Sequence, residues 1–124
     1  MSKEQKIKVL RVQPNLPPDV VYLDNELHAL QAAVGGLIEI IPLVIGTCLL
    51  LNEEGKLIGL EPNRRLGQDV LVGVFYIVGS DDSIGDLTSL PEDKISKYSK
   101  VFFFPETITA EEVEDSIRVE FYTF

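Results

Sequence analysis

Short runs of apolar and β-branched residues recur along the chain, and proline, glycine or a polar turn ends each within nine residues. Such runs favour β-strands over long helices. Their spacing is too irregular for a repeating strand–helix–strand unit, and hairpin signals dominate. The sequence therefore predicts an α+β domain with a mixed, mostly antiparallel sheet and two or three helices packed on one side of it. Strands are expected at residues 7–12, 20–23, 37–41, 44–51, 57–60, 70–78, 102–104 and 117–124.

Three segments carry helix signals instead. An alanine-rich segment favours a helix over residues 25–34, with Asp24 or Asn25 as its N-terminal cap. Gly35 can adopt the left-handed conformation that ends a helix. Residues 89–92 and 109–112 both match the capping-box pattern. Helices are therefore also expected from about residue 91 to Lys100 and, as a short acidic helix, after Thr109.

The clearest hairpin signal is the segment Asn52–Lys56. Asn52 suits the first position of a turn, and Gly55 suits the left-handed position of a type I turn with a bulge. We therefore expect residues 57–60 to return as a strand. The following residues, 61–69, are expected to form a polar connection to the next strand.

The length of 124 residues is ordinary for a single domain, so we expect one domain over residues 1–124. The net charge of −9 disfavours nucleic acid and anionic membranes as partners. More than half of this excess lies in residues 106–124. That segment is interpreted as a solvated acidic helix, or alternatively as a docking face for a basic partner.

Membrane insertion and export are not expected. The longest apolar stretch, residues 37–51, is broken by Glu39, Pro42 and Gly46, so it is too interrupted to cross a bilayer. The N-terminus is charged and has no apolar stretch of signal-peptide length after it. A single cysteine, Cys48, cannot form an intrachain disulfide. The sequence therefore predicts a cytoplasmic protein.

Few residues suggest catalysis. His28 is the sole histidine and has no identifiable partner, and Cys48 lies in an apolar run typical of a buried hydrophobe. Asp81, Asp82 and Asp86 form an acidic cluster, but their spacing does not match a calcium loop. No metal and no cofactor are therefore expected, and the sequence favours a non-enzymatic protein over an enzyme.

The candidate binding segment is Asn63-Arg64-Arg65, because adjacent arginines are unusual in so acidic a chain. A guanidinium is a rigid fork that matches carboxylate or phosphate, and Asp69 could orient one of the two. One interpretation is that both arginines pair with carboxylates of the chain itself. The alternative is that Asn63, Arg64, Arg65 and Asp69 bind an external anion.

An ordered set of short motifs gives the chain a family resemblance. They are LDN at 23–25, LQxxVGG at 30–36, IEIIPL at 38–43, NEEGKL at 52–57, GLEPNRR at 59–65 and GxFxxxG at 73–79. Over about residues 7–100 the chain resembles small uncharacterised proteins encoded largely by bacteriophages, plasmids and integrated elements, a family known only as a domain of unknown function. The resemblance implies a mobile-element origin, implies no activity, and suggests Asn52, Gly55, Asn63, Arg64 and Gly73 as pattern positions. Residues 101–124 lie outside it, as an acidic helix and strand extension.

Two functions are left as hypotheses. The first is an accessory protein of phage or mobile-element type that binds a host or element-encoded protein, with modulation of host defence as one version. The alternative is a module that binds a small, nucleotide-like anion through residues 63–65. A terminal strand rich in Phe121, Tyr122 and Phe124 could also pair across a homodimer.

Overall fold

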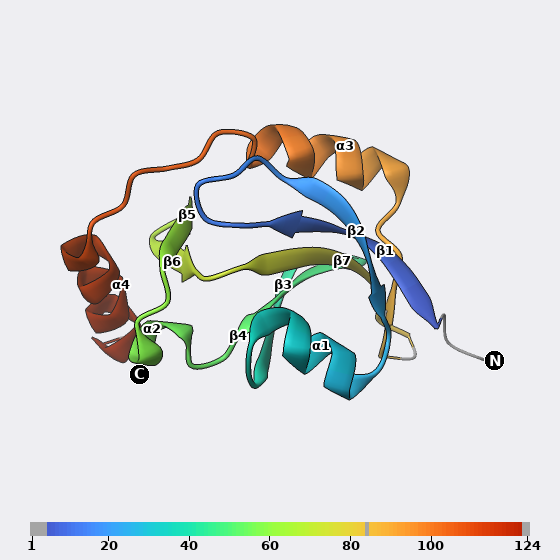
Figure 1. Ribbon diagram of the computed structural model, residues 1–124, viewed down its shortest axis with the longest axis horizontal. Coiled ribbons are helices and arrows are strands. Elements are labelled where there is room, and N and C mark those ends of the chain that lie inside the picture. Colours follow the sequence, from blue (N-terminus) through green and yellow to red (C-terminus); the bar gives the residue numbers. More distant parts are fainter. Residues whose placement is uncertain (1–4, 84, 123–124) are drawn as a thin grey trace.

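A six-stranded antiparallel sheet forms the centre of the computed structural model, which describes residues 5–83 and 85–122 (Figure 1). Its strands are, in spatial order, β2 (Asp19–Asp24), β1 (Lys6–Val12), β7 (Phe75–Asp81), β4 (Thr47–Asn52) and β3 (Ile38–Val44), and the short β8 (Asp86–Thr88) also pairs with β7. A separate hairpin joins β5 (Pro62–Leu66) to β6 (Asp69–Val72). The predicted α+β class is confirmed.

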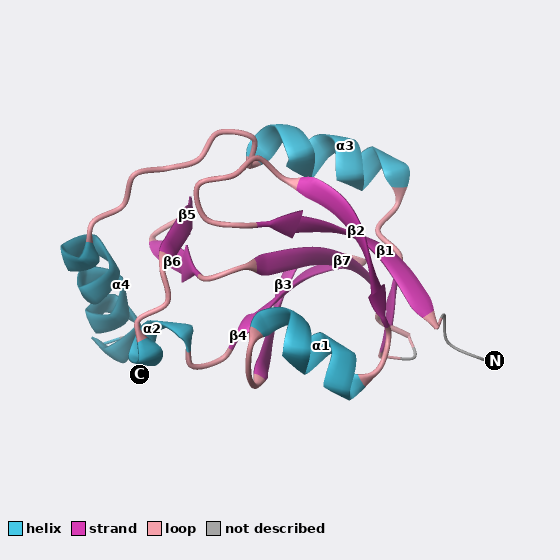
Figure 2. Cartoon of the chain, in the orientation of Figure 1, coloured by secondary structure: helices cyan, strands magenta, loops and turns pink. Residues whose placement is uncertain are grey.

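The helices pack on both faces of the large sheet, so the prediction of helices on one side is wrong. Helix α1 (Leu27–Val34) covers one face and α3 (Glu92–Val101) covers the other (Figure 2). The central strands β4 and β7 are apolar on both faces, and each face therefore needs cover. The short α2 (Gly55–Ile58) follows β4, and α4 (Ala110–Tyr122) lies beside β6.

Helices α1 and α3 each pack on a separate core cluster. Leu30 and Val34 of α1 join a cluster with Val9, Leu50 and Val78. On the opposite face, α3 contributes Ile95 and Tyr98 to a second cluster that also contains Leu10, Leu49, Phe75 and Ile77. No helix within residues 5–83 and 85–122 is both long and apolar enough to cross a membrane.

The predicted helix ends are partly correct. Gly35 adopts the expected left-handed conformation, with φ of 77°, and ends α1. Thr109 caps α4, since its Oγ1 accepts a hydrogen bond of 3.1 Å from the backbone N–H of Glu112. In contrast, no side chain caps α1 or α3. The Ser89 Oγ accepts from the backbone N–H of Lys8 instead, at 2.9 Å, and so joins β1 to the start of α3.

The hairpin predicted at Asn52–Lys56 is absent, and residues 57–60 do not form a strand. The Asn52 Oδ1 accepts from the Glu54 N–H at 2.8 Å, which turns the chain directly into α2. Gly55 does not adopt a left-handed conformation. Its role is spatial instead, because a Cβ atom there would lie 2.9 Å from Val72 Cγ2.

The predicted polar connection at residues 61–69 and the single strand at 70–78 are also wrong. Residues 62–72 form the β5–β6 hairpin. The strand conformation ends at Gly73, where φ is 70°. The Gly73 N–H donates to the Glu61 carbonyl at 2.7 Å. Strand β7 then begins at Phe75 and extends to Asp81, beyond the predicted end.

Pro42 does not separate two strands as expected. It lies inside β3, and the turn comes later, at Ile45-Gly46. Proline is tolerated there because β3 is an edge strand, and the register shifts between Pro42 and Val44. Strand β3 is half-exposed, whereas the sequence predicts a buried strand.

The C-terminal strands are also absent. Phe102 is buried at the end of α3, but Phe103 and Phe104 are exposed and lie outside any strand. Residues 117–122 continue α4 as a helix, because the cap at Thr109 starts a helix that nothing interrupts. Thr123 and Phe124 lie outside the described residues. The strand pairing proposed for a homodimer therefore has no strand between 117 and 122 to support it.

Candidate functional site

Arg64 lies in the protein interior, where its exposed fraction is 0%. Its Nε and Nη2 donate to the Phe102 carbonyl at 3.2 and 2.9 Å, and Nη2 also donates to the Leu16 carbonyl at 2.8 Å. Burial lowers the pKa of Arg64, because the charged form loses contact with water. The guanidinium nevertheless stays charged at neutral pH. It ties β5 to the end of α3 and to the loop after β1.

Asn63 completes this buried polar cluster. Its Oδ1 accepts a 2.7 Å hydrogen bond from Arg64 Nη1. Its Nδ2 donates to the carbonyls of Val12 and Gly73 at 2.9 and 2.8 Å. The hydrogen-bonding groups of the Asn63 and Arg64 side chains are thus engaged within the protein, and neither side chain is exposed to an external ligand.

Arg65 points the other way, toward the acidic C-terminal segment. Its side chain is 43% exposed and pairs with Glu106 at 2.8 Å and Glu112 at 2.6 Å. These hydrogen bonds raise the pKa of Arg65 and lower that of Glu112. Glu112 therefore ties α4 to the β5–β6 hairpin, and Glu106 ties the segment that leads into α4.

Replacing Arg65 with alanine is expected to loosen α4, because both ion pairs are lost. Amide hydrogen exchange should accelerate in residues 110–116 and stay unchanged in β1.

Lowering the pH should also loosen α4. The folded-state pKa of Glu112 lies below its ordinary value, so its stabilisation is present at neutral pH and is lost as pH falls through that lowered pKa.

The matched control is Arg11→Ala. It breaks a comparable ion pair, with Asp19 at 2.5 Å, on the main sheet. This control should leave exchange in α4 unchanged. Equal exchange of α4 in the wild type and in Arg65→Ala would show that Arg65 does not hold the helix.

Asp69 does not orient either arginine. Its carboxylate forms an ion pair with Lys56 and accepts a hydrogen bond from the backbone N–H of Val70 at 2.8 Å. Of the four residues predicted as a binding site, Asn63 and Arg64 are the pair whose side chains hydrogen-bond to each other. The segment works mainly as a structural junction in the described part of the chain.

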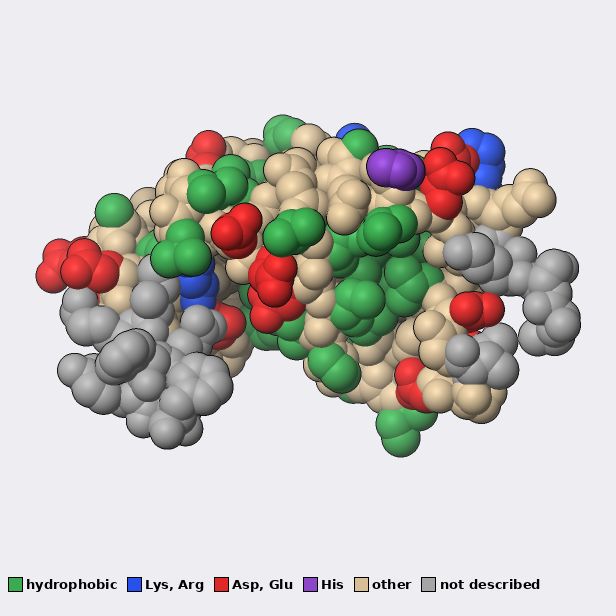
Figure 3. All heavy atoms as spheres, turned by 90° about the horizontal axis from the view of Figure 1, so that it is seen from below, with side chains coloured by type: hydrophobic (Ala, Val, Ile, Leu, Met, Phe, Trp, Pro, Cys, Tyr) green, Lys and Arg blue, Asp and Glu red, His purple; other side chains and the backbone are tan. Residues whose placement is uncertain are grey.

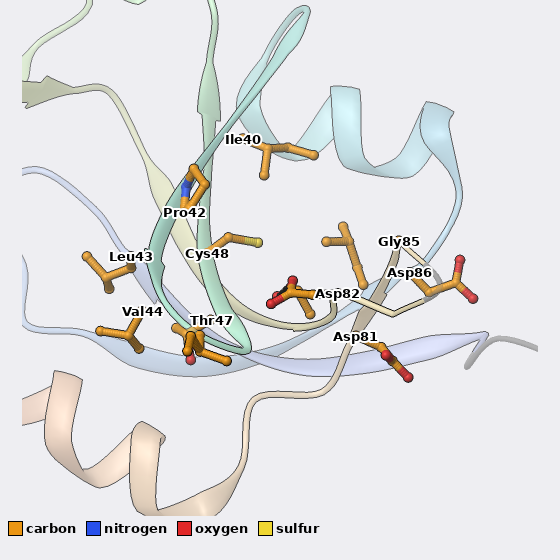
Figure 4. Close-up of a pocket in the computed structure, with 13 residues that line it drawn as sticks. Ile40, Pro42, Leu43, Val44, Thr47, Cys48, Asp81, Asp82, Gly85 and Asp86 are labelled. Atoms are coloured by element: carbon orange, nitrogen blue, oxygen red, sulfur yellow. Dashed lines mark hydrogen bonds between the residues drawn. The ribbon is translucent and has the colours of Figure 1, made fainter.

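A second region emerges only in three dimensions. A hollow of about 490 Å³ lies between the β3–β4 hairpin and the β7–β8 turn, within the size range of ligand-binding sites. Ile40 and Cys48 extend toward the end of the β7–β8 hairpin, where Asp82 lies in the turn and Asp86 begins β8 (Figure 4). On the face viewed in Figure 3, apolar side chains gather in a central hollow, and acidic side chains lie at its edge.

The rim of the hollow is acidic. Asp81, Asp82 and Asp86 line it, and its described lining contains no lysine or arginine. The Asp82 Oδ1 accepts from Ser80 Oγ at 3.1 Å and its Oδ2 accepts from the Gly46 N–H at 3.4 Å, so Asp82 joins the two hairpins. Asp81 accepts from Ser83 Oγ at 2.6 Å.

The hollow does not activate Cys48. Burial raises the pKa of the thiol, and the negative charge of Asp82 raises it further. A nucleophilic cysteine needs the opposite shift. His28 is not among the residues that line the hollow. In residues 5–83 and 85–122, no group of three or more His, Cys, Asp or Glu side chains is arranged to hold a metal ion.

The sequence indicates parts of this hollow separately but not their proximity. The acidic cluster at 81–86 was visible as a motif, and Cys48 was visible as a buried residue. The hollow requires the tips of two hairpins that are more than thirty residues apart in sequence. Their contact depends on the antiparallel pairing of β4 with β7, which places Cys48 opposite Val78.

Comparison with known proteins gives a family but no activity. The model of the family described as "Domain of unknown function (DUF3846)" matches residues 7–103. Searches found no matching curated protein and no matching solved structure. The matched range contains β1 except for Lys6, all of β2 to β8 and α1 to α3, and therefore both the buried arginine and the hollow, whereas α4 lies outside it. The chain thus belongs to the DUF3846 family of domains of unknown function.

Proposed function

We propose that this protein is a non-enzymatic accessory protein that acts by binding another protein. The observation that carries the proposal is the acid-rimmed apolar hollow and the exposed apolar side chains at its mouth. Ile45 is 95% exposed at the tip of the β3–β4 turn, and Ile40, further back along β3, is 53% exposed on the lining of the hollow. Turn tips normally carry polar residues. Exposed apolar side chains grouped around a hollow are typical of interaction sites.

The partner is proposed to be a host or element-encoded protein, and modulation of host defence is one version of this role. Support for that setting comes from the resemblance to proteins of phages, plasmids and integrated elements. The geometry of the site indicates which kinds of side chain would bind there, and it does not identify the partner. A cytoplasmic setting is part of the same proposal.

The anion-binding alternative has weaker support. A small anion would need accessible donors, but Arg64 is buried and its guanidinium already bonds two backbone carbonyls. Only Arg65 of the two is exposed, and an anion would have to displace Glu106 and Glu112. An enzymatic role also has weaker support, because burial and the charge of Asp82 raise the pKa of the Cys48 thiol in the hollow, which disfavours a nucleophilic thiolate.

The proposal is tested by capturing partners on immobilised full-length protein from lysate of cells that carry its gene. Ile45→Asp should abolish capture of the protein that the wild type retains, because it places a charge at the mouth of the hollow. The fold should be unaffected, since Ile45 is almost fully exposed.

Leu57→Asp is the matched control for that capture. Leu57 is 81% exposed on α2 and does not line the hollow, so this variant should capture the same protein as the wild type. Capture by the wild type that is lost in Ile45→Asp and kept in Leu57→Asp supports the proposal. Capture of nothing, or equal capture by all three proteins, contradicts it.

A further inference from the structure

We infer that the hollow receives an extended polypeptide segment that inserts an aliphatic side chain beside Ile40 and Cys48 and places a lysine or arginine between Asp81 and Asp86. This inference rests on the proposed function and names the chemistry of the partner. It follows from the extent of the apolar surface and from the arrangement of the carboxylates.

The apolar lining of the hollow extends along the β3–β4 hairpin to its tip. Ile40 and Cys48 line its interior, but Val44 and Ile45 continue the same apolar lining out to the tip of the hairpin. A small molecule seated in the hollow would leave Ile45 in water. A polypeptide segment covers both, because one side chain fills the hollow while its neighbours lie along the exposed edge.

Two aspartates of the rim occupy paired positions on neighbouring strands. In the antiparallel pairing of β7 with β8, Asp81 lies directly opposite Asp86. Like charges in directly opposite positions destabilise a strand pair. Among the described residues the Asp86 carboxylate has no hydrogen-bond or ion-pair partner, and no lysine or arginine lines the hollow to offset the repulsion. A cation supplied by a partner would relieve it.

The arrangement of the carboxylates on the rim favours the cation of a side chain over a metal ion. No group of acidic, histidine or cysteine side chains in the described part of the chain is arranged to hold a metal. A lysine ammonium or an arginine guanidinium can donate to both aspartates through separate N–H groups. Both carboxylate oxygens of Asp82 accept hydrogen bonds, from Ser80 and Gly46, whereas Asp81 accepts from Ser83 through Oδ1 alone. Asp81 Oδ2 and the Asp86 carboxylate are therefore the positions for this contact.

The test is a selection of random twelve-residue peptides displayed on phage against the full-length protein. We expect enrichment of peptides in which lysine or arginine lies within two residues of leucine, isoleucine or valine. A synthetic peptide of the enriched sequence should bind Asp86→Asn about three- to tenfold more weakly than the wild type, as expected for loss of a partly exposed ion pair. Its affinity should also fall with added salt.

Glu53→Gln is the control with the same change of charge. Glu53 is exposed and follows the end of β4 that lies away from the hollow, so affinity should not change. Ile45→Asp should weaken binding of the same peptide, which places it at the hollow. Replacing its basic residue with norleucine should weaken binding to the wild type but not to Asp86→Asn.

The outcomes separate this inference from the proposed function. Enriched apolar peptides without a basic residue, weakened by Ile45→Asp, would overturn the inference and leave the proposed function standing. Basic peptides that bind the wild type, Asp86→Asn and Ile45→Asp equally would show that the hollow is not their site and would overturn the inference. No enrichment of any peptide would count against both.

Discussion

Replacing Arg64 with alanine is expected to destabilise the protein by about 3–5 kcal/mol, a large part of the stability of a typical domain. The substitution leaves the Phe102 and Leu16 carbonyls and the Asn63 Oδ1 without their donor. Each unsatisfied buried acceptor costs about 1–3 kcal/mol. Removal of a buried charge offsets part of this loss. Urea unfolding should show a lower midpoint with an unchanged slope.

Arg64→Lys and Arg64→Met refine this expectation. A single ammonium cannot reproduce the fork that contacts Phe102, Leu16 and Asn63 together, so lysine should restore little. Methionine keeps much of the volume, but two of the acceptors are backbone carbonyls that stay buried or partly buried without a donor. Arg65→Ala should shift the midpoint far less, since its ion pairs are exposed. A wild-type midpoint for Arg64→Met would contradict the role assigned to these hydrogen bonds.

Gly73→Ala is expected to destabilise the protein by about 2–4 kcal/mol, for two separable reasons. The φ of 70° at Gly73 is a left-handed conformation that alanine adopts only with strain. In addition, an added Cβ atom would lie 2.7 Å from Leu60 Cδ1 and 3.4 Å from Leu60 Cβ. Thermal or urea unfolding measures the total effect.

Gly67→Ala separates the two contributions. Gly67 has a φ of 61°, but an added Cβ atom there would meet nothing within 4 Å. It should therefore show only the backbone strain, about 1–2 kcal/mol. Trimming the neighbour in the double variant Leu60→Ala/Gly73→Ala should recover the difference, as a double-mutant cycle would report. Equal losses in Gly67→Ala and Gly73→Ala would show that the approach to Leu60 is unimportant.

The pattern positions of the family resemblance are largely used by the fold. Asn52 turns the chain into α2 and donates to the Val34 carbonyl at 3.2 Å. Gly55 lets α2 approach Val72, and Gly73 lets the β6–β7 junction approach Leu60. Asn63 and Arg64 join four segments of backbone. None of these five residues lines the hollow.

Local chemistry in the sequence predicted the elements that depend on nearby residues. Strands 7–12 and 20–23, the helix ended by Gly35 and the cap at Thr109 are set by side-chain pattern, backbone preference and contacts within a few residues. For the same reason the α+β class was readable. The candidate segment 63–65 was recognisable as unusual, but not as buried.

Tertiary structure alone decided the rest, because each case depends on a contact between distant segments. Gly73 interrupts the apolar run at 70–78, where Leu60 packs close to it and Asn63 hydrogen-bonds to its carbonyl. Pro42 is accommodated because β3 is an edge strand of the sheet. The interior position of Arg64 depends on the carbonyls of Leu16 and Phe102. The acid-rimmed hollow exists because pairing of β4 with β7 brings two hairpin tips together, and no periodicity along the chain encodes that distance.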